Sequence, residues 1–186
     1  PVTLTTLPYP AADDAIGPTL MRGTDGAVYL SWLESKPDNV TALRFAKFDP
    51  ASAKWSAAQT ITQGSDFVVS GANCPQLAVE TDGRLTAVWF ANNPATEAHA
   101  PAGAHHHTTN FKAWYGQSAD DGVTWSEPQP LSQDSEFTEF VALQALAKGG
   151  VLAVWLDGRA KQAEGKAQQL YGRVIGSDGP DHLIDE

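Results

Sequence analysis

The sequence predicts an all-β fold in which about three four-stranded antiparallel sheets repeat along the chain. Two observations carry this prediction. A glycine turn, an apolar strand and a tryptophan recur at 26–32, 83–89 and 149–155, with six residues from the glycine to the tryptophan each time. A leucine stands six residues before each of these glycines, at positions 20, 77 and 143. The repeated unit is therefore a strand, a tight turn and a second strand.

Further strands are expected after each of these pairs. A third strand is predicted at 42–48, 111–117 and 169–175, and a shorter fourth near 58–62 and 128–132. The chain is expected to stop after the third strand of its third unit. The second strands are apolar nearly throughout, which is typical of strands covered on both faces. Short antiparallel sheets that recur every 57 to 66 residues are typical of β-propeller blades.

The predicted blades span approximately 15–62, 73–132 and 138–186, so that residues 1–186 form one partial propeller domain. A propeller usually needs about four or more blades before its ring closes and the open sheet edges disappear. We therefore expect roughly half of a six-bladed ring, with the remaining blades of the same ring as a partner. The alternative is a half-ring that associates with itself.

The composition of the chain bears on its partners and its location. The chain has 186 residues and a net charge of −10, which disfavours nucleic acid and anionic membrane surfaces. Its single cysteine, Cys74, excludes an intrachain disulfide and a cysteine-rich zinc site. No apolar run is long enough to span a membrane, and the first residues have neither a basic segment nor an initiator Met. We expect a secreted or periplasmic protein whose signal peptide is not present in this chain.

One short motif is specific. Ser118-x-Asp120-x-Gly122-x-Thr124-Trp125 resembles the Asp-box of sialidases and related β-propellers at every defining position. The Asp side chain can accept backbone N–H bonds inside the turn, the Gly takes a conformation open to few residues, and the Trp packs between strands. In that family the hairpin joins the third and fourth strands on the face opposite the active site. The resemblance therefore implies a structural motif.

The resemblance to sialidases also implies a chemistry. Sialidases remove terminal sialic acid with three arginines on the substrate carboxylate, an Asp acid, and a Tyr nucleophile assisted by a Glu. The family's Phe-Arg-Ile-Pro motif is absent at both matching positions, 15–18 and 73–75. The stretch 153–159 resembles the place where sialidases present an Asp and an Arg, so Asp157 and Arg159 are the predicted catalytic residues. The alternative is a salt bridge between them that orders the loop.

The longest loop on the expected ligand face, 92–110, has 19 residues and four of the five histidines. Loops of this length are often functional. Asn92, His105 and His107 in this loop, with Asp66 in the loop before blade 2, are predicted to bind substrate. Consecutive histidines on an extended chain point to opposite sides, so no metal site and no cofactor are predicted. A solvated loop is the alternative.

Three classes of function follow. The first is a glycoside hydrolase of exo-α-sialidase type that acts on terminal sugars of glycoconjugates. The second is a noncatalytic propeller that binds a glycan or a protein, which the missing Phe-Arg-Ile-Pro motif favours. The third is a structural or assembly propeller. A carbohydrate or glycoconjugate is the expected partner in the first class. In the second class the partner is either a glycan or a protein.

Overall fold

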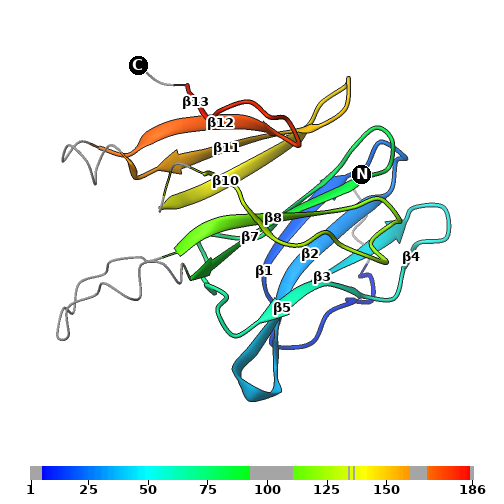
Figure 1. Ribbon diagram of the computed structural model, residues 1–186. Helices are drawn as coiled ribbons and strands as arrows, with labels where there is room; N and C mark the ends of the chain where they lie inside the picture. Colours follow the sequence, from blue (N-terminus) through cyan, green and yellow to red (C-terminus); the bar gives the residue numbers. More distant parts are fainter. Residues whose placement is uncertain (1–5, 93–110, 134, 136, 160–166, 185–186) are drawn as a thin grey trace, which may run out of the picture.

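The computed structural model describes residues 6–92, 111–133, 135, 137–159 and 167–184. In this part of the chain three antiparallel sheets follow one another in sequence order, here called blades 1, 2 and 3 (Figure 1). Blade 1 contains β1 Ile16–Arg22, β2 Val28–Lys36, β3 Val40–Asp49, β4 Lys54–Trp55 and β5 Gln59–Gly64. Blade 2 contains β6 Gln76–Val79, β7 Leu85–Asn92, β8 Phe111–Ser118 and β9 Gln129–Pro130. Blade 3 contains β10 Thr138–Ala145, β11 Val151–Asp157, β12 Gln169–Ile175 and β13 His182–Leu183.

The same tight turn joins the first two strands of every blade. In each, the N–H of the recurring glycine donates over 3.0 Å to the carbonyl three residues earlier. Gly26, Gly83 and Gly149 have φ angles of 80°, 88° and 90°, in the left-handed region that side chains disfavour. The repeated spacing of six residues from glycine to tryptophan therefore corresponds to the same turn in all three blades. This agrees with the all-β prediction.

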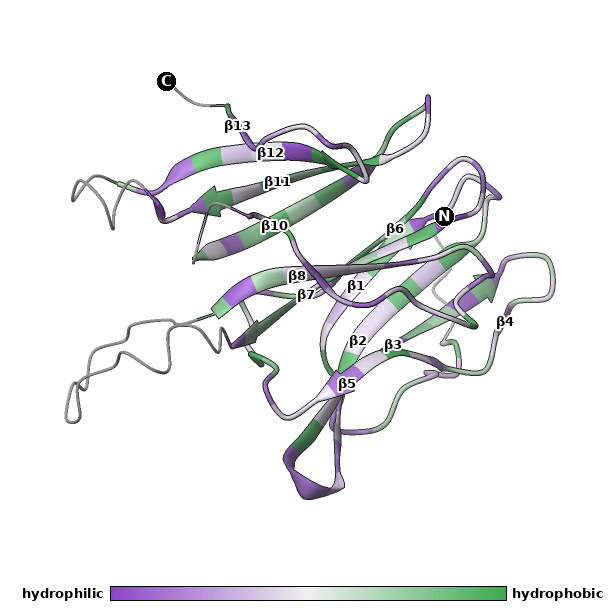
Figure 2. Cartoon of the chain, in the orientation of Figure 1, coloured by the Kyte–Doolittle hydropathy of each residue, from purple (hydrophilic) through white to green (hydrophobic). Residues whose placement is uncertain are grey.

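Each recurring tryptophan is buried on the same side of its blade. Trp89 belongs to the hydrophobic cluster between blades 1 and 2, and Trp155 belongs to the cluster between blades 2 and 3. Trp32 lies in a smaller cluster with Leu30 and Ala46 on the free side of blade 1. Figure 2 shows that hydrophobic residues concentrate on the strands. The blades are therefore held together mainly by apolar contacts between sheets.

A buried glutamate connects all three blades. Glu80, in the turn after β6, is only 2% exposed. Its Oε2 accepts the N–H of Gly150 in blade 3 over 2.9 Å, and its Oε1 accepts the hydroxyl of Thr86 in blade 2 over 3.2 Å. Its backbone carbonyl accepts the hydroxyl of Thr24 in blade 1 over 3.2 Å. Apolar packing between the blades is thus supplemented by directional hydrogen bonds.

Blade 3 has a fourth strand, so the expectation that the chain stops after the third strand of its third unit is wrong. The short β13 pairs with β12 through Tyr171 opposite Leu183 and Gly172 opposite His182. A strand of two residues is too short to leave a periodic pattern in the sequence. In blade 1, β4 and β5 both pair with β3.

The pairing of β2 and β3 continues to Lys36 opposite Val40. A 3-10 turn, η1 Pro37–Asn39, joins the two strands. The third strand therefore begins at Val40, two residues before the predicted range of 42–48.

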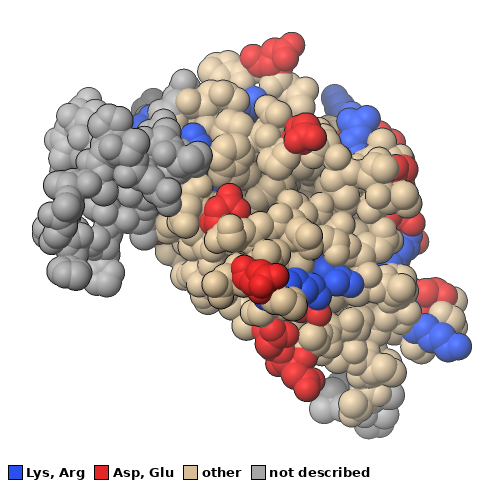
Figure 3. All heavy atoms as spheres, turned by 60° about the horizontal axis from the view of Figure 1, so that its bottom comes forward, with Lys and Arg blue, Asp and Glu red and all other residues tan. Residues whose placement is uncertain are grey.

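The described surface mixes charges. On the face shown in Figure 3, acidic and basic side chains lie beside one another among many uncharged residues. Within the described ranges, no helix has the length and apolar character that crossing a membrane requires.

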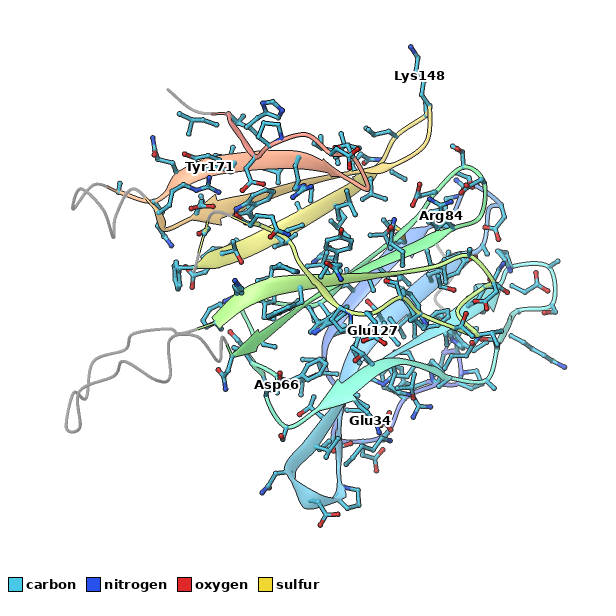
Figure 4. The ribbon with its side chains drawn as sticks, viewed as in Figure 1. Glu34, Asp66, Arg84, Glu127, Lys148 and Tyr171 are labelled. Atoms are coloured by element: carbon cyan, nitrogen blue, oxygen red, sulfur yellow. The ribbon has the colours of Figure 1, made fainter. Side chains whose placement is uncertain are left out.

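The blades have two distinct ends. The recurring turns lie at one end, here called the turn end, where Figure 4 labels Arg84 and Lys148. Glu34 and Asp66 are labelled at the opposite end, here called the loop end (Figure 4). The strand register places the last residues of β2, β7 and β11 at the loop end, since each pairs with the first residue of the next strand.

Candidate functional site

The hairpin between β8 and β9 is held by its own side chains. The hydroxyl of Ser118 donates to Asp120 over 2.8 Å, and Asp120 also accepts the backbone N–H of Thr124 over 2.9 Å. Gly122, with φ of 84°, donates its N–H to Ser118 Oγ and accepts the indole N–H of Trp125. These contacts lie at the turn end, away from the loop end. They make the hairpin a structural element.

The hairpin also packs against blade 1. The rings of Trp125 and Phe45 meet edge to face with centroids 6.2 Å apart. A Cβ built on Gly122 would lie 2.3 Å from Phe45, so no larger residue fits at this position without movement. The short distance explains why glycine is required here in addition to its positive φ.

Asp157, one of the two predicted catalytic residues, is fully buried at the end of β11. Its Oδ1 accepts the backbone N–H and the Nε–H of Arg159, both over 2.9 Å. Its Oδ2 accepts the indole N–H of Trp155 over 2.9 Å and an Arg159 NH2 hydrogen over 2.8 Å. Both carboxylate oxygens are therefore occupied by donors from within the chain.

Arg159 has a second carboxylate partner that the sequence did not suggest. Its NH2 group donates to Asp181 Oδ2 over 2.6 Å and to Ser132 Oγ over 3.1 Å. Its guanidinium lies over the Tyr171 ring, 4.0 Å from the centroid. Asp181 comes from the segment between β12 and β13, 22 residues after Arg159. The cluster links that segment to the ends of β9 and β11.

The pKa values follow from these contacts. Burial would raise the pKa of Asp157, but hydrogen bonds from Arg159 and Trp155 outweigh it and keep the pKa below its ordinary value. Burial likewise opposes the charge of Arg159, but the hydrogen bonds that it donates to Asp157 and Asp181 raise its pKa. Both groups are thus charged at neutral pH, and Asp157 is poorly suited to donate a proton.

Acid should weaken the fold through these carboxylates. The hydroxyl of Thr124, and then its backbone N–H, donate hydrogen bonds that lower the pKa of Asp120 to about 2. The pKa of Asp157 is also lowered. Because both folded-state pKa values lie below the ordinary 3.8, the stability that the ionised groups contribute is present above about pH 4. The contribution of Asp120 should be lost as the pH falls from there toward about 2, and that of Asp157 as the pH falls through its own lowered pKa.

The comparison of wild type with Asp120→Asn at pH 7 and pH 2.5 checks this expectation. The stability advantage of the wild type in urea unfolding should shrink at the lower pH, where Asp120 begins to protonate. An equal advantage at both pH values would contradict it.

Asp66 and Asn92, two predicted substrate-binding residues, lie together at the loop end. The N–H of Asn92 donates to the carbonyl of Asp66 over 2.8 Å, and both residues are exposed. Phe67 bridges to Ala91, so the segment entering blade 2 runs beside the end of β7. His105 and His107 lie outside the described residues.

Asp66 and Asn92 line a groove of about 250 Å³ between blades 1 and 2, here called the inter-blade groove. The Phe67 and Trp89 rings at the groove are stacked, with centroids 6.5 Å apart and an angle of 17°. Trp114 is paired with Trp89 across β7 and β8. The other lining residues are Thr62, Gln63, Ala91 and Pro128.

Trp114 is a further feature of the inter-blade groove. Its indole Nε1 is buried and has no hydrogen-bond partner within the described ranges. Lys112 Nζ lies 5.7 Å from its ring centroid. Sequence reasoning did not single out Trp114 or Phe67, although an aromatic residue opposite a repeated tryptophan was a usable signal. Aromatic walls with a few polar groups are typical of small-ligand sites.

The comparisons with known proteins bear on the fold. No protein-family profile and no curated protein matches the sequence. A structure of a protein of unknown function from Dyadobacter fermentans DSM 18053 has a TM-score of 0.61 at 14% identity, over 97% of this chain and 58% of that one. The structure of an endo-arabinase from Bacteroides thetaiotaomicron has a TM-score of 0.54 at 13% identity, over 89% of this chain and 58% of that one. The structure of an endo-1,4-β-xylanase from the same organism has a TM-score of 0.55 at 14% identity, over 95% of this chain and 60% of that one.

These structures establish the class of fold. The chain is an all-β, propeller-like protein, and it spans about three fifths of the length of the three structures. At sequence identities this low, structural similarity establishes the fold alone, and function has to be inferred from the site.

Proposed function

We propose that this chain is part of a glycan-binding propeller in which the inter-blade groove holds a sugar. The observation that carries the proposal is the convergence of Asp66, Asn92 and Trp114 on one groove at the loop end. A carboxylate and an amide can hydrogen-bond to neighbouring hydroxyl groups, and an aromatic ring can cover the apolar face of a sugar. The groove therefore offers both kinds of contact that a glycan needs.

The similar structures support the same ligand class. Two of them are an endo-arabinase and an endo-1,4-β-xylanase, whose names refer to polysaccharides. The self-bonded 118–125 hairpin supports the narrower proposal of an Asp-box propeller of sialidase type. Further blades of the same ring and a secreted or periplasmic location belong to this proposal as well.

Hydrolysis of terminal sugars is the finer form of the proposal. It would assign chemistry to Asp157 and Arg159, whose polar atoms make the internal contacts described above. We therefore propose that this pair orders the end of β11 and that glycan binding is the function of the described residues. The catalytic assignment stays a prediction.

Oligosaccharide affinity tests the proposal. Calorimetry with arabinohexaose, xylohexaose and sialyllactose should show binding of at least one by the full chain. Asp66→Ala and Asn92→Ala should each weaken it by roughly tenfold, because one polar contact to a charged or amide group contributes about 1–2 kcal/mol. The matched control is Asp82→Ala, an exposed carboxylate in the turn between β6 and β7.

The outcomes separate the alternatives. Equal losses in all three variants, or no loss in the two groove variants, would contradict a sugar site in the groove. Absence of binding to every oligosaccharide would contradict the glycan proposal and favour a protein-binding or structural propeller.

A further inference from the structure

Phe140 combines features that are unusual for a strand residue. It lies in β10, where the pairing with β11 shifts register between Glu139 and Ala142. Its φ is 51°, in the left-handed region that large side chains disfavour. Its side chain is 50% exposed. A bulky aromatic residue in this conformation costs free energy, and such residues concentrate at functional sites.

The first strand of blade 1 has the same irregularity. Gly17 precedes Leu20 by three residues, as Phe140 precedes Leu143, and the pairing of β1 with β2 shifts register between Ile16 and Thr19. Gly17 has a φ of 61°. The bulge therefore recurs in the first strands of blades 1 and 3, and glycine meets its backbone requirement without strain. The backbone alone does not explain a phenylalanine at this position.

A buried residue in the segment that leads into blade 2 binds the backbone of Phe140. The N–H of Phe140 donates to Asn73 Oδ1 over 3.0 Å, and Asn73 is 5% exposed. The blade 1 bulge contacts the same segment, because the Thr19 hydroxyl donates to the carbonyl of Pro75 over 2.8 Å. The two bulges therefore flank the segment that leads into blade 2.

The position of Phe140 is at the loop end. Thr138, two residues earlier, pairs with Asp157 at the end of β11. The ring is thus presented on the first strand of blade 3, from a backbone that is hydrogen-bonded to Asn73. A rigid aromatic side chain loses little conformational entropy when a ligand covers it.

We propose that Phe140 is a stacking platform for the apolar face of a sugar ring, forming a second sugar contact apart from the inter-blade groove. The inference rests on the proposed glycan-binding function. A sugar ring fits the exposed aromatic surface because its C–H groups cover the ring while its hydroxyl groups stay in water. Phe140 acts as a binding residue and takes no part in bond breaking.

Affinity for the same three oligosaccharides tests Phe140 in the full chain. Phe140→Ala should weaken binding by about tenfold, and Phe140→Trp should keep it within about threefold, because stacking needs an aromatic face. Phe140→Gly should lose binding as Phe140→Ala does while its melting temperature stays equal or rises, because the strained φ is relieved. The matched control is Val123→Ala, 75% exposed in the hairpin at the turn end, and it should leave affinity unchanged.

The results distinguish this inference from the proposed function. Binding by the wild type that Phe140→Ala leaves unchanged would overturn the platform and leave the groove proposal standing. A change in self-association on size-exclusion chromatography, without a change in sugar affinity, would show that Phe140 packs against protein and would also overturn it. Absence of binding by the wild type would overturn both proposals.

Discussion

Replacing Arg159 with alanine is expected to lower the free energy of unfolding by about 3–5 kcal/mol, because Asp157 and Asp181 would remain buried without their shared cation. For a chain of this size the melting temperature should fall by roughly 6–20 °C. The side chain of Asp157 is fully buried and that of Asp181 is 2% exposed. Asp181 keeps an ion pair with Arg173 at 3.7 Å, so the larger part of the cost falls on Asp157. Thermal unfolding followed by circular dichroism measures the effect.

The control for Arg159 is Arg84→Ala. Arg84 is 46% exposed and its nearest carboxylate, Asp82, lies 3.9 Å away, so its loss should change stability by less than about 0.5 kcal/mol. An Arg159→Ala variant with an unchanged melting temperature and a large loss of sugar affinity would contradict the structural role. That result would support the catalytic or substrate-binding prediction for this arginine.

Glu80→Ala should be the second most damaging substitution, with a loss of about 2–4 kcal/mol in the free energy of unfolding. It removes the acceptor for the Gly150 N–H, the Thr86 hydroxyl and, at 3.4 Å, the Gln117 amide. A buried donor that loses its partner carries the full cost of desolvation. Urea unfolding gives the change in free energy, and Glu80→Gln should lose less because it keeps one acceptor oxygen.

Amide hydrogen exchange makes this expectation specific to the contact between blades. The Gly150 amide should exchange faster in Glu80→Ala than in the wild type, since its acceptor is gone. Glu127→Ala, an exposed glutamate at the surface, provides the control and should change neither quantity (Figure 4). Unchanged protection of Gly150 in Glu80→Ala would contradict the role of Glu80 as a link between blades.

Much of the fold could be predicted from the sequence because its signals are local and repeated. The turn glycines and the tryptophans six residues later mark the first two strands of each blade, and the tryptophans are buried on one common side. The β13 strand was not predicted, whereas the equally short β9 lies within the fourth strand predicted near 128–132. Two residues carry no period of their own. The continued pairing of β2 and β3 depends on hydrogen bonds that no side-chain pattern records.

The candidate site was less predictable because its contacts join distant parts of the chain. Asp157 and Arg159 are two residues apart and could be paired by inspection, whereas Asp181 meets Arg159 only through the packing of the segment before β13. The link from Glu80 to Gly150 spans 70 residues. Asp66 and Asn92 were named as separate candidates, and only the folded chain shows that they share a groove.

The most direct test of the glycan-binding account uses the indole N–H signals of the six tryptophans in a ¹⁵N-labelled chain. Titration with arabinohexaose, xylohexaose or sialyllactose should move the signal of Trp114, identified by its loss in Trp114→Phe. The signal of Trp155, whose indole N–H is hydrogen-bonded to Asp157, should stay in place. A Trp114 signal that remains unmoved at saturation by a bound oligosaccharide, or a shift confined to Trp125 at the turn end, would contradict a sugar site in the inter-blade groove.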